Sequence, residues 1–276
     1  MIIIRLKGGL GNQLFQYAFG RLLSIKKNVQ VKYEFINPKD DTQREYKLGH
    51  FNAVVEMPTQ EEIKKTSGGF SKLINFVEKR VLRQYNIGYV PNLLNKKDGY
   101  LEGYWQSYRY LEPIKKELLW EITLKKPIDQ KLREIVDKIN QTNSVSVHIR
   151  RGDYVNDPKT KAEHYTFGLE YYKEAFKIIR TKVQNPTLFV FSDDIEWVKE
   201  NLKSDLPTVF VPNDPDYESF FTATYCEHNI IANSSFSFWI AWLNKNPDKI
   251  VIAPKKWNNK YQDKYKDLLP PEWIKI

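Results

Sequence analysis

The stretch VSVHIRRGDY, residues 145–154, contains the most informative strand of the sequence. Its alternation places valine and isoleucine side chains on one face of an extended chain, and His148 and Arg150 on the other. From residue 145 onward, short apolar runs alternate with helical patterns, which is typical of βα units and a parallel sheet. We predict strands at 145–149, 187–191, 208–211, 229–232 and 249–253. Five such strands with intervening helices form a small doubly wound domain.

The first half opens in the same way. An apolar strand at 2–6 leads through a Gly-rich turn into a helix with one apolar face, and second and third strands are predicted near 29–35 and 100–104. A helix that starts near Ile128 bridges the halves. We therefore predict an α/β fold with two domains, residues 1–140 and 141–276.

Composition limits the class of protein. Hydrophobic residues make up 41% of the 276 residues, so the chain has enough apolar material for packed cores and is not mainly disordered. The single cysteine, Cys226, excludes an intramolecular disulfide. No segment approaches the roughly 18 apolar residues of a membrane helix, which predicts a cytoplasmic protein. The net charge of +9 favours an anionic partner, whether nucleic acid, an anionic membrane surface or a phosphorylated small molecule.

The Gly-rich turn GGLG, residues 8–11, stands at the start of the first helix and is followed by two amides. It is not a P-loop, because no Lys-Ser/Thr pair follows, and Leu14 replaces the third glycine of a dinucleotide fingerprint. A tight βα turn would explain the glycines alone. Amides at a helix start on the carboxyl side of a strand favour a ligand site instead. The candidate ligand-binding residues are Gly9, Gly11, Asn12 and Gln13.

The strand at 145–149 ends in a cationic loop. His148 and Arg150 project together at its carboxyl end, and Arg151, Gly152 and Asp153 follow. A guanidinium presents a fixed fork of donors that suits a diphosphate, whose charge grows as it leaves. A buried Arg-Asp ion pair that closes a turn is the competing explanation. Two adjacent arginines that share one carboxylate leave positive charge unpaired, which favours an anionic ligand.

Two more polar segments follow predicted strands. Asn233, Ser234 and Ser235 open a helix, where they provide an N-cap, a phosphate site at the helix N-terminus, or both. Asp194 is predicted to cap the helix that follows it, whereas Asp193 could accept N–H donors from a purine base.

A pair of carboxylates in the loop Asp214-Pro215-Asp216 offers a different interpretation. Two carboxylates could hold Mg²⁺ or Mn²⁺ beside a nucleotide diphosphate. A loop followed by a helix cap is the favoured explanation.

Four motifs together resemble glycosyltransferase family 11, the α-1,2-fucosyltransferases, in its bacterial branch. They are GGLGNQLFQYA at 8–18, LEGYWQ at 101–106, HIRRGDY at 148–154 and IIANSSFS at 230–237. They span nearly the whole chain in the family's order, so the combination is specific although each motif alone is not.

This resemblance implies two Rossmann-like domains in a GT-B-type arrangement, with the active site in the inter-domain cleft. It implies inverting transfer of L-fucose from GDP-β-L-fucose to the 2-hydroxyl of a terminal galactoside, with no required metal or other cofactor. GDP-fucose would bind residues 141–276 and the acceptor glycan residues 1–140.

The resemblance also assigns roles to residues. Arg150 would bind the diphosphate with His148 near the nucleotide, and Asn12 would lie near the reacting centre. Asp153 is the first choice for the general base, with an arginine-orienting role as the alternative. The predicted catalytic residues are Arg150, Asp153 and Asn12. The predicted substrate-binding residues are His148, Arg151, Asp193, Asn233, Ser234, Ser235, Gly9, Gly11 and Gln13.

The chain departs from the family pattern at one position that bears on the nucleotide. Many relatives carry an aspartate where this chain has Ser219, preceded by Glu218, which leaves open a guanine contact from that helix.

Alternative functions remain beside the leading one. The same fold could use another GDP-sugar or form a different linkage. A non-enzymatic nucleic-acid-binding protein would fit the charge, but the sequence has neither a single basic stripe nor a nucleic-acid motif. The lysine-rich aromatic tail, residues 255–276, fits a lipid-linked acceptor at the inner membrane face, although a helix packed through its Trp and Tyr residues explains it more simply.

Overall fold

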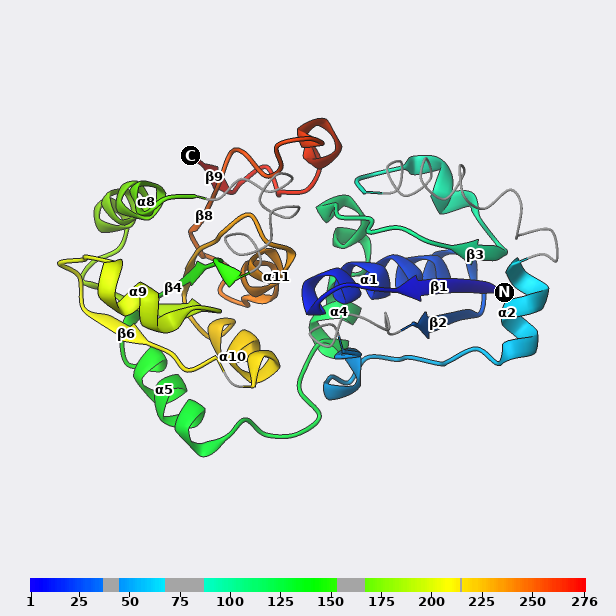
Figure 1. The fold of residues 1–276 in the computed structure, drawn as a ribbon, viewed down its shortest axis with the longest axis horizontal. Coiled ribbons are helices and arrows are strands. Elements are labelled where there is room, and N and C mark those ends of the chain that lie inside the picture. The colour runs from blue at the N-terminus through cyan, green and yellow to red at the C-terminus, as the bar shows by residue number, and fades with distance from the viewer. Residues whose placement is uncertain (37–44, 68–86, 153–166, 214) are drawn as a thin grey trace. The chain divides into compact units, whose positions relative to one another are not determined.

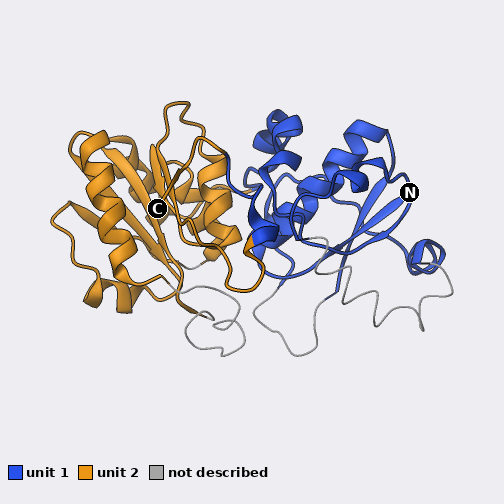
Figure 2. Cartoon of the chain, turned by 90° about the horizontal axis from the view of Figure 1, so that it is seen from above, with its two compact units in different colours: residues 1–125, 263–270 blue, residues 126–262, 271–276 orange. Residues whose placement is uncertain are grey.

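A computed structural model describes residues 1–36, 45–67, 87–152, 167–213 and 215–276 (Figure 1). The chain forms two compact units, coloured separately in Figure 2. The first comprises residues 1–125 and 263–270, and the second comprises residues 126–262 and 271–276. In the described part of the chain, no helix is both long and apolar enough to cross a membrane.

The first unit is built on a small parallel sheet of order β2-β1-β3. Strand β1 (Ile2–Leu6) lies between β2 (Val31–Phe35) and β3 (Gly99–Leu101), and helix α1 (Leu10–Lys27) connects β1 to β2. The helix ends where Asn28 takes a left-handed φ of 50°, after two lysines that suit the negative end of its dipole. Strand β3 is shorter than predicted.

Short helices complete the first unit. They are the α-helices α2 (Gln60–Ser67) and α4 (Lys115–Glu121), and the 3-10 helices η1 (Leu48–His50), η2 (Pro91–Asn95), η3 (Tyr108–Tyr110), η4 (Glu112–Ile114) and η5 (Gln262–Tyr265), the last of which starts in the second unit.

The second unit holds a six-stranded parallel sheet of order β6-β5-β4-β7-β8-β9. Its strands are β4 (Asn143–Ile149), β5 (Pro186–Ser192), β6 (Thr208–Phe210), β7 (His228–Ile230), β8 (Val251–Ala253) and β9 (Ile274–Lys275). Its helices are α5 (Gln130–Asn140), α8 (Leu169–Lys182), α9 (Ile195–Asn201), α10 (Asp216–Ala223) and α11 (Ser235–Leu243). The five predicted strands and the parallel α/β fold are confirmed.

The order of the second sheet reverses at its first strand. Strands β5 and β6 extend the sheet on one side of β4, and β7, β8 and β9 extend it on the other. In open α/β sheets, ligands bind outside the carboxyl ends of the strands where the order reverses. The first sheet reverses at β1 in the same way, since β2 and β3 lie on opposite sides of it.

Strand β4 buries both of its faces. Val145 and Val147 belong to the apolar core that includes the buried side of α8. On the other face, Ser146 accepts a hydrogen bond of 2.7 Å from Asn229 on β7, and His148 is also buried. The alternation predicted for this strand is confirmed, but its polar face is packed rather than solvated.

The predicted tail helix is wrong in extent, since the only helix in residues 255–276 is the 3-10 helix η5, but the predicted packing of the tryptophans is confirmed. The chain instead ends in β9, which adds a strand beside β8, and Trp257 and Trp273 are 3% and 5% exposed. A two-residue strand has too few positions to show a period of two, so the sequence pattern did not reveal it.

The predicted boundary near residue 140 falls at the end of α5, which belongs to the second unit. The division of acceptor and donor binding between residues 1–140 and 141–276 stays a prediction.

Candidate functional site

The predicted site residues form two clusters, one in each unit, and each lies at a strand reversal. The β4 cluster contains His148, Arg150, Arg151, Asp193, Asn233, Ser234 and Ser235. The β1 cluster contains Gly9, Gly11, Asn12 and Gln13. Asp153, the predicted base, and Asp214 of the alternative metal site lie outside the described residues.

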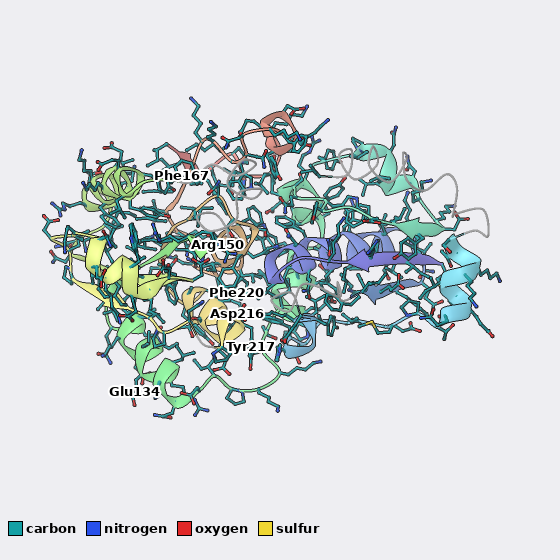
Figure 3. All side chains as sticks on the ribbon, viewed as in Figure 1. Glu134, Arg150, Phe167, Asp216, Tyr217 and Phe220 are labelled. Carbon is teal, nitrogen blue, oxygen red and sulfur yellow. The ribbon has the colours of Figure 1, made fainter. Side chains whose placement is uncertain are left out.

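Arg150 lies where β4 ends, as Figure 3 shows. Strand register explains its partner: Ile149 pairs with Ser192 of β5, so the next residues along, Arg150 and Asp193, stand side by side. The Arg150 Nη1 and Asp193 Oδ2 atoms are 2.8 Å apart, a close ion pair whose angles do not make an aligned hydrogen bond at Oδ2. The Arg150 side chain is 31% exposed, so it reaches the surface at the strand reversal.

Arg151 turns away from Arg150 toward α9. Its Nε donates to Asp194 Oδ2 at 3.1 Å, and its guanidinium lies 3.2 Å from the centre of the Trp197 ring. Each arginine thus has a carboxylate of its own, and the premise that the pair shares one carboxylate is wrong. The predicted cap is also wrong, because Asp194 occupies the N-cap position of α9 without a side-chain capping bond. Arg151 and Asp194 follow the paired ends of β4 and β5, and local sequence does not reveal that these ends lie side by side.

Asp193 orients the whole turn after β4. Its Oδ1 accepts the backbone N–H of Arg151 at 2.8 Å while its Oδ2 faces Arg150. A Cβ on Gly152 would lie 2.4 Å from that Oδ2, so any larger residue would displace the Asp193 carboxylate. Asp193 therefore fixes both arginines, and its contact with a purine base stays a prediction.

His148 connects β4 to α11. It is 5% exposed, its Nδ1 lies 2.5 Å from the Ser237 Oγ, and its ring centre lies 5.1 Å from that of Phe236. Burial, together with the positive charge of Arg150, lowers the pKa of His148 from 6.5 to about 3. A neutral imidazole bonded to Ser237 holds the start of α11 against the end of β4.

We expect this buried histidine to make the fold less stable in acid. The unfolded chain binds a proton at His148 below pH 6.5, whereas the native pKa of about 3 prevents it. Between these pH values, native stability falls as pH falls, by at most about 1.4 kcal/mol per pH unit for this group. Denaturant unfolding of the wild type and of His148→Gln across this range measures the effect. The difference between the two slopes isolates His148, and parallel slopes would contradict its buried neutral state.

The start of α11 is an uncapped helix N-terminus. Ser234 occupies the N-cap position, but its side chain makes no capping bond, so the predicted hydroxyl cap is not formed. Asn233 instead donates its amide to the carbonyl oxygen of Trp257 at 2.9 Å. Val147 of β4 pairs with Ile230, the last residue of β7, and α11 begins shortly after that strand ends. The cationic end of β4 and the N–H groups of α11 therefore flank the same strand reversal.

In the β1 cluster, the structure separates the glycines by role. The positive φ of 79° belongs to Gly8, and a Cβ there would lie 2.6 Å from the Asn12 Nδ2. Gly9 is exposed, with open space where a Cβ would stand, and Gly11 is buried inside α1. The backbone at Gly9 is therefore open to solvent, whereas Gly11 is part of the helix packing.

Gln13 is buried and connects the turn after β1 to residues 45 and 47. Its Nε2 donates to the carbonyl oxygens of Gly8 and Glu45 at 2.9 and 2.8 Å, and its Oε1 accepts the N–H of Lys47 at 3.0 Å. Both amide hydrogens and the carbonyl oxygen of Gln13 have protein partners. Gln13 therefore shapes the turn and has no group left for a ligand.

Sequence reasoning missed the polar residues that follow β3. Gln106 donates its Nε2 hydrogen bond to Asn12 Oδ1 at 2.7 Å, and Glu102 pairs with Arg5 and Lys7 at 3.1 and 3.0 Å. The contact from Gln106 to Asn12 crosses 94 positions of sequence, so no local spacing predicts it. The motif at 101–106 marked this segment in the sequence. Its role became clear only from the pairing of β3 with β1, which brings these residues close to the start of α1.

Helix α10 uses its polar residues to hold the unit together. Ser219 is buried and donates its hydroxyl to the carbonyl oxygen of Pro212 at 2.7 Å. Glu218 accepts the N–H of Asp129, just before α5, at 2.7 Å. Both side chains therefore have structural partners, and neither supports a guanine contact.

Comparison with known proteins places the whole chain beside sugar transferases. The family model described as "Glycosyl transferase family 11" matches residues 1–276. The chain is 33% identical to an alpha-1,2-colitosyltransferase of Escherichia coli, over 100% of its own length and 99% of that protein. It is 32% identical to the O-antigen biosynthesis glycosyltransferase WbnK of Escherichia coli, over 98% and 99% of the two chains.

Among solved structures, NodZ alpha-1,6-fucosyltransferase co-crystallised with GDP matches with a TM-score of 0.49 and 12% identity. The match covers 87% of this chain and 90% of that one.

Proposed function

Because this chain belongs to glycosyl transferase family 11, we propose that it transfers L-fucose from GDP-β-L-fucose to a terminal galactoside. The family match over residues 1–276 makes the chain a glycosyltransferase. The donor, the attack by the 2-hydroxyl of galactose, the inversion and the independence from metal are the proposed parts.

The β4 strand reversal is the observation that carries the proposal. Arg150 offers a forked cation at one strand end, and α11 offers an uncapped N-terminus beyond the neighbouring strand. Helix N-termini and guanidinium groups are both suited to phosphate oxygens. We therefore assign the diphosphate of the donor to the space outside β4 and β7, with Ser234 and Ser235 as further phosphate contacts.

The proposed chemistry follows from that charge. As the bond between fucose and the nucleotide breaks, negative charge grows on the pyrophosphate, and fixed cations and N–H dipoles stabilise it without a metal ion. The acceptor hydroxyl attacks from the opposite face and gives an α-linked product. Asp153 is the proposed general base, and Asn12 is proposed to lie near the reacting centre.

We place the active site in the cleft of a GT-B-type arrangement, with the donor on residues 141–276 and the acceptor on residues 1–140. The four motifs shared with the family support this placement, because they divide between the two halves of the chain.

The second candidate keeps the chemistry and changes the donor. It is favoured by the 33% identity to a colitosyltransferase over the full chain. Colitose lacks one ring hydroxyl that fucose carries, and a site that hydrogen-bonds this hydroxyl would reject the sugar without it. A purified enzyme given GDP-fucose, GDP-colitose and other GDP-sugars with a galactoside therefore decides the donor. Faster transfer of colitose than of fucose would move the assignment to the second candidate.

We expect the transfer to persist in EDTA at an unchanged rate, because the arginine and the helix N-terminus replace a metal at the diphosphate. Product formation is measured with EDTA, and again after Mg²⁺ or Mn²⁺ is returned. Loss in EDTA and rescue by Mn²⁺ would transfer the diphosphate role to a metal site at Asp214 and Asp216.

Two partner assignments have their own tests. A higher Tm with GDP, but not with UDP or ADP, would support GDP as the nucleotide of the donor. Salt-sensitive binding to DNA or RNA, without any effect of GDP on Tm, would favour a nucleic-acid partner. A lipid-linked acceptor and peripheral contact with the membrane predict flotation of the protein with anionic liposomes, and absence of binding would remove the membrane part.

A further inference from the structure

A hydrogen bond between two side-chain amides joins the first turn of α1 to the segment that follows β3. Gln106 Nε2 donates to Asn12 Oδ1 at 2.7 Å, between two strands that neighbour each other in the sheet of the first unit. Gln106 is 7% exposed, and Asn12 is half-buried. The bond therefore connects a buried amide to one that reaches the surface of the unit.

The backbone at Gln106 is held in place by a strained neighbour. The preceding Trp105 has a φ of 47°, in the left-handed region that bulky residues rarely adopt. Its buried ring is stacked on Phe19 with centres 4.4 Å apart, and the Gln106 N–H donates to the Ile87 carbonyl oxygen at 2.6 Å. Such strain persists only where surrounding contacts enforce it. The fold therefore fixes the direction from which Gln106 meets Asn12.

A side-chain amide has an oxygen that accepts and an NH₂ group that donates hydrogen bonds, so its orientation decides which group a ligand would meet. Because Gln106 donates to Asn12 Oδ1, the carbonyl end of the Asn12 amide faces the protein. No hydrogen-bond acceptor for Asn12 Nδ2 exists among the residues that the structure describes. The amide hydrogens of Asn12 are thus the group left for a ligand.

We propose that Gln106 is a positioning residue that holds Asn12 with its N–H donor toward the substrates, where it bonds an acceptor oxygen of sugar or phosphate. The inference rests on the proposed function for the identity of the substrate but not for the orientation of the amide. If Gln106 had only a structural role, the orientation of the Asn12 amide would not matter for the reaction.

Gln106→Glu reverses the hydrogen bond with little change in the shape of the side chain. The ionised carboxylate of this variant cannot donate to Oδ1, so the Asn12 amide turns to donate Nδ2 and presents its carbonyl to the substrate. We expect kcat near pH 7.5 to fall about 10²-fold, with a smaller change in KM for the donor. Once protonated, the introduced carboxyl group can donate again, so the ratio of variant to wild-type kcat should rise as pH falls through the pKa of that group.

Other charged residues of the same unit are common to both proteins. They are Lys7, Glu45, Lys47, Glu102, Arg109, Lys264 and Asp267. Since they are present in the wild type as well, the ratio of the two rates removes their contribution. Gln130→Glu, the same change at an exposed position in the first turn of α5, is the matched control and should keep the wild-type profile.

The side-chain amide signal of Asn12 separates this inference from the proposed function. In ligand-free protein, the ¹⁵N–¹H signals of the Asn12 side chain should shift with pH in Gln106→Glu by more than they do in the wild type. A wild type that transfers no sugar, with a titrating Asn12 signal in the variant, would overturn the function alone. A signal and a rate ratio that are both independent of pH, with only a lower Tm, would overturn the positioning role.

Discussion

Replacement of Arg150 by alanine is expected to lower kcat for sugar transfer about 10³-fold while the protein stays folded. Arg150 lies at the end of β4, 31% exposed and oriented by Asp193 at 2.8 Å. In the proposed reaction, it faces charge that increases on the pyrophosphate as the sugar departs. Loss of such a group therefore affects the transition state more than the bound substrate. Turnover measures the loss of rate, calorimetry with GDP measures the smaller effect on binding, and Tm measures whether the fold is retained.

Two further variants make the Arg150 result specific. Arg150→Lys keeps the charge but loses the planar fork, so it should recover only part of the rate. Arg180→Ala removes another arginine of the second unit, one that pairs with Asp205 on the surface, and should leave turnover unchanged and Tm nearly so. If Arg150→Ala kept more than about a tenth of the wild-type kcat and bound GDP normally, the diphosphate would have to bind elsewhere.

The sequence predicts the second unit well, since each of its first five strands is a short apolar run followed by a helical pattern. The face of β4 that carries His148 follows from alternation alone. The partners of Arg150 and Arg151 do not, because they depend on how β4 aligns with β5. Local chemistry also misled at Ser234, which has the residue type of a cap but makes no capping bond.

The first unit was harder to predict because its site depends on contacts between distant segments. Gln13 and Asn12 are adjacent amides in sequence, yet Gln13 is buried with its amide bonded to backbone groups, while Asn12 is half-buried and bonded to Gln106. Only the position of β3 beside β1 distinguishes them. Both units nevertheless place their motifs at the first strand of a sheet, where the strand order reverses. That shared position is the physical reason why four dispersed motifs form two clusters.

Ser235→Asp should change stability and nucleotide binding in opposite directions. Ser235 is the first residue of α11 and is half-buried. A carboxylate in the first turn interacts favourably with the helix dipole and should stabilise the ligand-free protein by about 0.3–1 kcal/mol. The same charge would repel the diphosphate and compete for the helix N–H groups, so GDP affinity should fall about 10²-fold or more.

Ser235→Asn is the matched control, since it has nearly the shape of aspartate without the charge. It should keep most of the GDP affinity, and the gap between the two variants should narrow as salt screens the repulsion. Tm without ligand and the shift that GDP adds are measured for all three proteins at low and high salt. Unchanged GDP affinity in the aspartate variant would mean that α11 is not the phosphate site. The uncapped helix predicts that only the aspartate variant combines a higher Tm without ligand with no further rise in Tm when GDP is added.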